Sequence, residues 1–479
     1  MSYPGQAHHP HSPGNPPLAH LIHRSHPVDE QHPYVPPGLE LVQAHWFVRH
    51  GERAPVRQRL VGVGDIPPVF SLCSVGREFR PAVLSFTPSV SPSALAGEPP
   101  SPAILPTEAT TGKNVAAGTM DVRRLTEDVG SSARGTRGGP SDCYWGELTD
   151  LGRRSTLELG ARLRSLYVDQ LNFLPPTFTL SNSSVASFRS TNMPRTIESL
   201  HQIVEGLWGK EKREEGAKVE YLIRGWQDED LYPNTSCKRL RALDSASIAA
   251  ATKEQAPVLA ALDSVLEPVV GAPLRIDSSP RASGVLDTVL VCRAHGIKLP
   301  KELEDPKTLR LLEGAICHEW FDGYKNIEFR KLAMGRLLSS LRQTLEAKAN
   351  DPLEKVEKTR LAVYSCHDTS IAGILNALDA FDNRWPPFTS HVAVELFRSA
   401  SPPSLLSSFL PSFLRPSHPH YVRLRFNARN LRLPACAPEG KHLPGSNGEV
   451  CTFEAFKDAV RDVEVSSKEW RGLCGNTVE

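Results

Sequence analysis

The sequence predicts an α/β fold in which helices flank a central mixed sheet and a smaller, mainly helical cap is inserted into the chain. Two kinds of segment support this prediction. Short apolar runs at 41–48, 184–188 and 361–366 indicate buried strands, and the last two are each followed by a helical pattern. Leucines recur near helical spacing in residues 151–171 and 329–349, and the stretch from about 197 to 350 looks mainly helical.

Low-complexity segments divide the chain. Residues 1–38 are expected to form a disordered tail rich in His and Pro, which leaves a folded domain over 39–470. Within that domain, residues 85–139 are rich in Pro, Ser, Gly, Ala and Thr, so we expect a long and mostly irregular surface insertion. A second insertion at 399–420 is more apolar, but Pro411 interrupts it, and packing on the parent domain is favoured over membrane contact.

The overall charge excludes some partners. Lys and Arg total 55 and Asp and Glu total 54, a formal net charge of +1 over 479 residues, so no bulk field attracts nucleic acid. We find neither an export signal nor the run of about 20 apolar residues that a membrane span needs. An intracellular location is therefore favoured over secretion, although compartment and oligomeric state stay open. Any bound anion must be met by a local cluster.

Three predicted strands end in residues that suit such a cluster. In an open α/β sheet, ligands bind beyond the carboxyl ends of the strands. The residues at these three ends are Arg49, His50 and Arg53, then Arg189, then His367 and Asp368. If the strands are neighbours, they build a pocket of three arginines, two histidines and one carboxylate, which fits a phosphoryl group.

Each residue type matches a step of phosphoryl transfer. Guanidinium groups bind phosphate oxygens bidentately and stay charged at any working pH. A neutral imidazole such as His50 can attack phosphorus and carry the phosphoryl group. The alkoxide leaving group then needs a proton, which a carboxylic acid such as Asp368 can supply. Gly51, which lacks a side chain, is expected to let backbone and ring approach the phosphate closely.

These residues carry a family resemblance. The stretch Arg49-His50-Gly51-x-Arg53-x-Pro55, the segment RSTNMPRT at 189–196 and the His367-Asp368 pair resemble the signatures of the histidine acid phosphatases. This family is the branch of the histidine phosphatase superfamily that includes phytases. GELT at 146–149 with Gly152, and WPPFTSHVAVELF at 385–397, agree with it. The similarity runs from about 40 to 460, interrupted by the two insertions.

The resemblance implies a fold, a chemistry and a set of site residues. The fold would be an α/β core with a smaller, mostly helical cap. The activity would be that of a phosphomonoesterase of acid phosphatase type acting on a small phosphate ester, without metal or cofactor. His50 would be the nucleophile and Asp368 the proton donor. The residues that would bind phosphate are Arg49, Arg53, Arg189 and His367. Cys436 and Cys451 resemble the disulfide-closed hairpin of some members.

Alternatives stay open for function and for single residues. Within the family, the protein could be a phytase or a lysophosphatidate phosphatase. A different class of function is a phosphate-binding scaffold without catalytic activity. Such a scaffold would be expected to lack the nucleophile or the proton donor, and this sequence keeps both. Asp368 could simply cap the following helix, and Arg189 could pair with a carboxylate. Arg195 is expected to be structural. His318-Glu319 lacks the second histidine of a HExxH zinc site. Nine cysteines include no CxxC pair, and their odd number leaves at least one unpaired.

Overall fold

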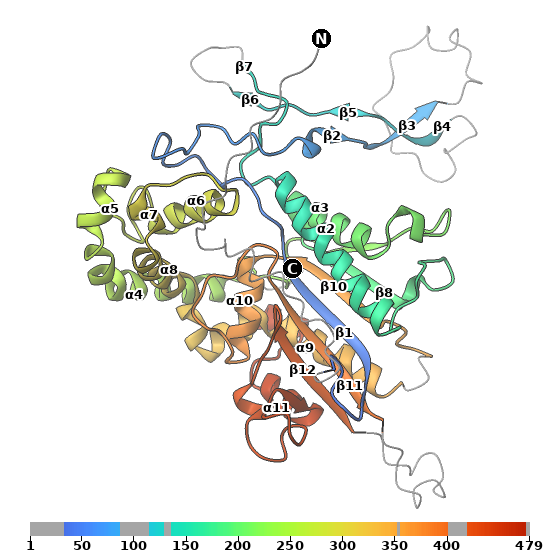
Figure 1. The fold of residues 1–479 in the computed structure, drawn as a ribbon. Helices are drawn as coiled ribbons and strands as arrows, with labels where there is room; N and C mark the ends of the chain where they lie inside the picture. The colour runs from blue at the N-terminus through green and yellow to red at the C-terminus, as the bar shows by residue number, and fades with distance from the viewer. Residues whose placement is uncertain (1–32, 87–114, 129–135, 352–354, 401–418, 476–479) are drawn as a thin grey trace, which may run out of the picture. The chain divides into compact units, whose positions relative to one another are not determined.

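The computed structural model describes residues 33–86, 115–128, 136–351, 355–400 and 419–475 (Figure 1). The chain forms two compact units. One comprises Met1–Pro68 with Trp145–Glu479, and the other comprises Val69–Tyr144. The predicted tail falls mostly outside the described residues, as do much of the 85–139 segment and residues 401–418.

An eight-stranded mixed sheet forms the centre of the first unit. Strand β1 (Leu39–Arg49) lies in the middle, parallel to β10 (Leu361–Cys366) and antiparallel to β11 (His391–Ser399). The sheet order is β13-β12-β11-β1-β10-β8-β9, and β14 pairs with β12. The remaining strands are β8 (Ala186–Ser190), β9 (Tyr221–Ile223), β12 (His420–Phe426), β13 (Arg429–Asn430) and β14 (Val450–Thr452). The predicted α/β fold with a mixed sheet is therefore confirmed.

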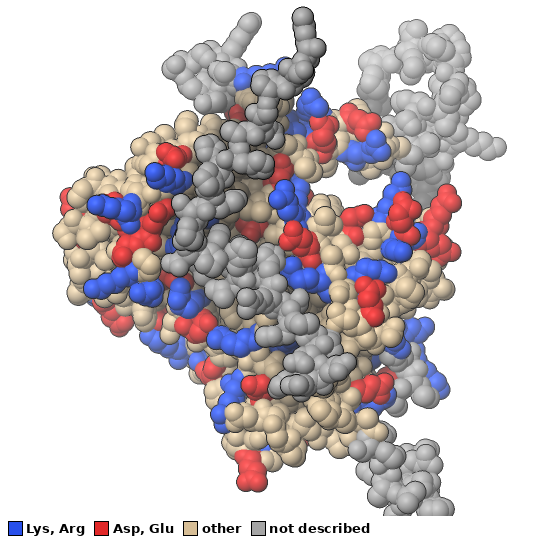
Figure 2. Space-filling model, in the orientation of Figure 1, with Lys and Arg blue, Asp and Glu red and all other residues tan. Residues whose placement is uncertain are grey.

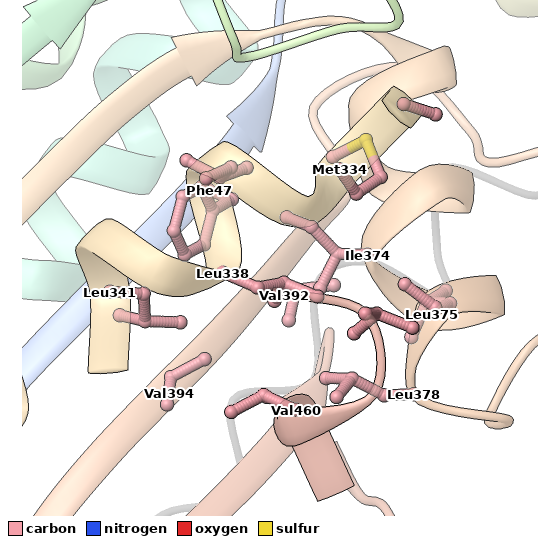
Figure 3. Packing of buried hydrophobic residues seen from close by; sticks show 14 of the residues in the cluster. Phe47, Met334, Leu338, Leu341, Ile374, Leu375, Leu378, Val392, Val394 and Val460 are labelled. Carbon is pink, nitrogen blue, oxygen red and sulfur yellow. The ribbon is translucent and has the colours of Figure 1, made fainter. Parts of the chain in front are cut away.

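Two apolar clusters cover the sheet. The first joins β1 and β8 to α2 (Asp150–Arg164) and α3 (Pro194–Leu207). The second joins β1, β10 and β11 to α9 (Ile327–Ala349), α10 (Asp368–Ala377), α11 (Phe453–Arg461) and α12 (Ser467–Leu473). Figure 3 shows Phe47, Leu338 and Val392 within the second cluster. Burial on both faces explains why β1 lacks the apolar-polar alternation of a half-exposed strand.

The helical segment between β9 and α9 supplies one side of the site described below. Its helices are α4 (Lys238–Ala260), α5 (Asp263–Val270), α6 (Ala282–Ala294), α7 (Lys301–Glu304) and α8 (Pro306–Phe321). The predicted cap region at about 197–350 also contained α9 and most of α3. Both of these helices pack in the clusters that cover the sheet, because each presents an apolar stripe to it.

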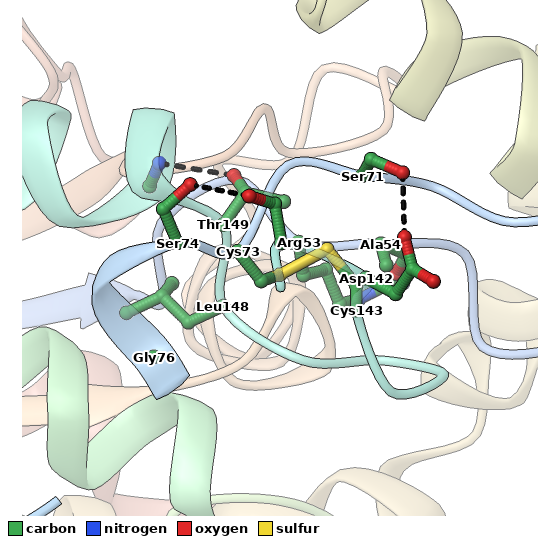
Figure 4. The surroundings of a disulfide bond; sticks show 12 residues. Arg53, Ala54, Ser71, Cys73, Ser74, Gly76, Asp142, Cys143, Leu148 and Thr149 are labelled. Carbon is green, nitrogen blue, oxygen red and sulfur yellow. Dashed lines mark hydrogen bonds between the residues drawn. A yellow bond between two sulfur atoms is a disulfide. The ribbon is translucent and has the colours of Figure 1, made fainter. Parts of the chain in front are cut away.

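The second unit contains short strand pairs and a disulfide. Its pairs are β2 (Glu78–Phe79) with β5 (Val122–Arg123), β3 (Ala82–Phe86) with β4 (Val115–Thr119), and β6 (Glu127–Asp128) with β7 (Thr136–Arg137). Cys73 bonds Cys143, and beside this bond Ser71 donates to Asp142 at 2.6 Å (Figure 4). The 85–139 segment lies within this unit, and its described residues include β4 to β7.

Two further disulfides lie in the first unit. Cys436 bonds Cys451, as the family resemblance implied. Cys237, at the N-cap of α4, bonds Cys474, which follows α12, across 237 residues of sequence. Among the described residues Cys292, Cys317 and Cys366 are free and buried.

The surface charge and the apolar character of the helices agree with the sequence composition. On the face shown in Figure 2, acidic and basic side chains are interspersed, which agrees with the balanced totals in the sequence. Within the part of the chain that the structure describes, no helix combines the length and the apolar run that crossing a membrane requires.

Candidate active site

Three neighbouring strand ends meet at one edge of the sheet. β10 lies between β1 and β8 and is parallel to both, so their carboxyl ends point the same way. His50 N donates to Cys366 O at 3.0 Å, and Thr191 N donates to Ser365 O at 3.2 Å. The side chains of His367 and Thr191 are joined by a hydrogen bond of 3.0 Å between Nε2 and Oγ1. The first and third predicted strand ends therefore contribute histidines to one site.

The His50 ring is oriented by the backbone of the next residue. Its Nδ1 lies 2.8 Å from the carbonyl oxygen of Gly51. Because a carbonyl can only accept, Nδ1 carries the ring proton and Nε2 keeps a lone pair. Burial, followed by the charges of Arg49 and Arg195, holds the pKa of His50 well below its ordinary value. The ring is therefore neutral, as a nucleophile must be.

The loop after His50 packs directly on the start of α2. A Cβ on Gly51 would lie 2.3 Å from the carbonyl oxygen of Gly152, and one on Gly152 would lie 2.1 Å from that of Glu52. Neither contact is possible, so both positions require glycine. We expected Gly51 to give room to phosphate, but the structure assigns it this backbone contact. Thr149 caps α2, accepting from Gly152 N at 3.2 Å.

Arg49, which is buried, and Asp368, which is partly exposed, form an ion pair. Arg49 Nη2 lies 2.8 Å from Asp368 Oδ2, and its Nη1 donates to Pro386 O. Burial would raise the pKa of Asp368, but Arg49 and then Arg53 hold it below its ordinary value. Burial also lowers the pKa of Arg49 to about 10, which still leaves it charged. The N-cap of α10 is His367, and Asp368 is the first residue of that helix.

His367 is neutral like His50. Burial, and then the charge of Arg195, lowers the pKa of His367 to about 3. The two imidazole centroids lie 5.7 Å apart at an edge-to-face angle, and the Tyr232 ring lies 5.6 Å from His367 on another side. Tyr232 comes from the segment after β9 and carried no recognisable pattern in the sequence.

Arg53 is held between an aromatic ring and a carboxylate. Its guanidinium carbon lies 5.6 Å from the centroid of Phe388, whose ring also lies 4.2 Å from that of Arg49. Arg53 Nη2 contacts Asp287 Oδ1, on α6, at 2.7 Å. Asp287 was not among the predicted site residues, because nothing in the sequence around it marks it.

Arg189 does not join this cluster, and its predicted role in phosphate binding is corrected here. Its guanidinium forms buried ion pairs with Glu229 and with Asp230, the latter at 2.7 Å. Arg189 lies opposite Tyr364 on β10, and Tyr364 stacks on Phe47 at 4.5 Å between ring centroids. The side chain of Arg189 therefore leaves the sheet through one face and does not extend beyond the strand end.

Arg195 occupies the place expected for Arg189. Arg195 lies in the first turn of α3. Its positive charge lowers the pKa of His50 and of His367, and it is attracted to the carboxylate of Asp368. Its Nε is buried and finds no hydrogen-bond partner among the described residues, and the same holds for the Nε atoms of Arg49 and Arg53. Buried donors normally have partners, so three such atoms around His50 suit an anion. A signal was available, because a helix that follows a parallel strand begins at the ligand-binding edge.

Within the described ranges, no group of three or more His, Cys, Asp or Glu side chains is arranged to hold a metal ion. His318 instead faces Asp322 at 3.0 Å on the outside of α8.

Comparison with known proteins identifies the family. Residues 40–270 and 318–427 match the model of the histidine phosphatase superfamily, branch 2. A protein of Schizosaccharomyces pombe named probable acid phosphatase is 34% identical over 478 residues, covering 92% of this chain and 95% of the relative. The chain belongs to branch 2 of the histidine phosphatase superfamily. It is a phosphomonoesterase.

Three further proteins are similar to this phosphatase at lower sequence identity. Lysophosphatidic acid phosphatase type 6 of Homo sapiens is 27% identical over 340 residues, covering 70% of each chain. A Hafnia alvei phytase in complex with myo-inositol hexakis sulphate has a TM-score of 0.51 at 14% identity, over 90% of this phosphatase and 98% of that chain. A Bifidobacterium longum multiple inositol polyphosphate phosphatase has a TM-score of 0.52 at 11% identity, over 92% and 96%. These two structures share its fold.

Proposed function

We propose that this phosphatase hydrolyses phosphate monoesters through a phosphohistidine at Nε2 of His50. The observation that carries the proposal is the hydrogen bond of 2.8 Å between His50 Nδ1 and Gly51 O, which leaves Nε2 unprotonated among three arginines. Nε2 attacks phosphorus, and the bond between phosphorus and the ester oxygen breaks. Water then attacks the phosphohistidine, releasing orthophosphate and restoring His50.

The phosphate-binding group in this proposal is Arg49, Arg53, Arg195 and His367. The arginines neutralise the charge of the phosphoryl oxygens and stabilise the transition state, which in phosphoryl transfer is most of catalysis. Arg195 replaces Arg189 in the set, because Arg189 is occupied by Glu229 and Asp230.

Asp368 is the proposed proton donor, and substrate binding prepares it. In the free protein Arg49 keeps this carboxyl ionised. A phosphate dianion bound to the same arginines places negative charge beside Asp368 and draws Arg49 toward itself, and both effects raise the pKa of the carboxyl. The protonated acid then protonates the departing alkoxide, and the resulting carboxylate accepts a proton from the attacking water.

An oxidising compartment is proposed as the site of action. The three disulfides join positions up to 237 residues apart, and structural disulfides persist in oxidising environments. This proposal replaces the intracellular location favoured by the sequence.

One experiment tests the chemistry. The wild type and His50→Ala are assayed for phosphate release from a nitrophenyl ester, a lysophosphatidate, phytate and sugar phosphates. We expect the variant to fold and to release no phosphate from any of them, and the ranking of substrates decides between the phytase and lysophosphatidate alternatives. Rapid quenching with a labelled ester should leave acid-labile, base-stable label on the wild type. Label on serine or cysteine would overturn the proposal.

A further inference from the structure

Helix α6 brings a second carboxylate into the site. Asp287 lies on α6, and its Oδ1 contacts Arg53 Nη2 at 2.7 Å while its Oδ2 accepts from Val56 N at 3.2 Å. The Asp287 side chain is 16% exposed and that of Arg53 is 8% exposed, so solvent screens the pair only partly. Asp287 thus holds one of the cations proposed to bind phosphate.

Asp287 also interacts with other cations nearby. The negative charge of Asp287 favours the charged forms of Arg49 and Arg195 in the site. It has the same effect on Arg59, in the loop that follows Arg53. The Arg59 guanidinium lies against Gly284, three residues before Asp287, and its buried Nη1 has no hydrogen-bond partner among the described residues. Asp287 therefore lowers the positive potential at Arg53 and at Arg59.

Carboxylates are paired with the arginines around His50. Arg53 is paired with Asp287 and Arg49 with Asp368, and both histidines are neutral. In the proposed mechanism Asp368 is protonated when a phosphate dianion binds, whereas the carboxylate of Asp287 stays on Arg53. A substrate with several phosphates would place additional negative charge against Asp287.

We propose that Asp287 is a specificity-determining residue that competes with phosphate for Arg53 and gives the site its preference for esters with one phosphate. This inference rests on the proposed function of the same site. Asp287 weakens binding of every phosphate to Arg53, and it penalises polyphosphates most, because their additional phosphates meet it while Arg59 is partly neutralised.

The test uses Asp287→Asn, which removes the charge and keeps one of the two acceptor oxygens, so that either Arg53 or Val56 N keeps its acceptor. The matched control is Asp263→Asn, which removes a carboxylate from the half-exposed Arg275 pair between α5 and α6. Binding of orthophosphate is measured by calorimetry, and kcat/KM is measured with nitrophenyl phosphate and with myo-inositol hexakisphosphate. Asp287→Glu keeps the charge and should keep the wild-type preference.

For Asp287→Asn we expect orthophosphate to bind about tenfold more tightly and the kcat/KM ratio of hexakisphosphate to nitrophenyl phosphate to rise about tenfold. The control should leave both unchanged. Weaker phosphate binding, or an unchanged ratio, would reduce Asp287 to a support for Arg53 and overturn the inference. If Asp287→Asn does not fold, Asp287→Ser is judged by the same two readouts. A wild type that neither binds orthophosphate nor hydrolyses the esters would overturn the proposed function itself.

Discussion

Asp368 Oδ2 lies 2.8 Å from Arg49 Nη2, so the proposed proton donor of the phosphatase is paired with an arginine proposed to bind phosphate before substrate arrives. The two residues come from chain segments more than 300 positions apart, the end of β1 and the start of α10. The pairing couples the proton donor to the phosphate site, because an anion that binds Arg49 weakens the ion pair and thereby raises the pKa of Asp368.

Replacing Asp368 by Asn tests its role as donor. Asp368 Oδ1 accepts from Thr369 N at 2.8 Å at the start of α10, and the side-chain oxygen of Asn can accept the same bond, so a purely structural Asp368 would tolerate the change. Loss of a general acid typically costs about 10² to 10⁴ in rate. We expect that loss in the phosphorylation burst with an alkyl phosphate, and a smaller loss with nitrophenyl phosphate, whose phenolate departs unaided. Equal bursts for variant and wild type on the alkyl ester would leave the donor unidentified.

The pH profile tests the neutral state of His50. Its pKa is held well below the ordinary value by burial and by Arg49, so the nucleophile stays unprotonated in mild acid. The single-turnover phosphorylation rate should therefore not decline as pH falls from 7 to 5. A tenfold loss per pH unit below about 6.5, the pKa of an unperturbed histidine, would contradict this assignment.

Acid should also destabilise the fold through its neutral histidines. The folded pKa of His367 is lowered to about 3 by burial and then by Arg195, and burial lowers that of His45 to about 3. The unfolded chain therefore binds more protons between about pH 6.5 and 3. The free energy of unfolding contributed by these groups is fully present above the unfolded pKa and is lost as pH falls through that window. Urea titrations at pH 7 and pH 5 measure it, and equal stabilities would contradict it.

Arg195 and Arg189 should respond in opposite ways to alanine. Arg195→Ala should lower the rate by about 10² to 10³, the usual cost of one charge-stabilising donor, with little change in stability. Arg189→Ala leaves Glu229 buried without its cation, which typically costs about 3–5 kcal/mol of unfolding free energy. Assays and urea titrations of both variants separate the two roles. A catalytic defect in Arg189→Ala with normal stability would restore Arg189 to the site.

Chelation tests whether arginine alone supplies the positive charge. Treatment with EDTA should leave hydrolysis of nitrophenyl phosphate intact, since guanidinium groups surround His50. The control is a metal-dependent phosphatase treated in parallel. Activity that disappears with EDTA and returns with a divalent ion would contradict the proposed mechanism.

Much of the fold follows from local pattern. The apolar run of β1 and the leucine spacing of α9 predict an α/β protein, because a strand buried on both faces is apolar throughout and a helix packed on a sheet repeats its apolar residues every three or four positions. The motif around His50 and the His367-Asp368 pair were also readable, because each lies directly after its strand. The boundaries of the cap region could not be read from the sequence, because α3 and α9 have the same helical pattern whether they pack on the cap or on the sheet.

The sequence by itself determined the strand-end motifs and the formal net charge of +1, and it predicted the chemistry proposed for His50, Asp368, Arg49 and Arg53. Only the tertiary structure favours Arg195 over Arg189 as a member of the proposed site. Both residues lie in one short motif, but their side chains point in different directions. A side chain within β8 leaves through a face of the sheet, where Glu229 meets it, whereas one in the first turn of α3 can reach the edge. The same holds for Asp287, which lies more than 230 positions from Arg53 and approaches it only because α6 folds back over the site.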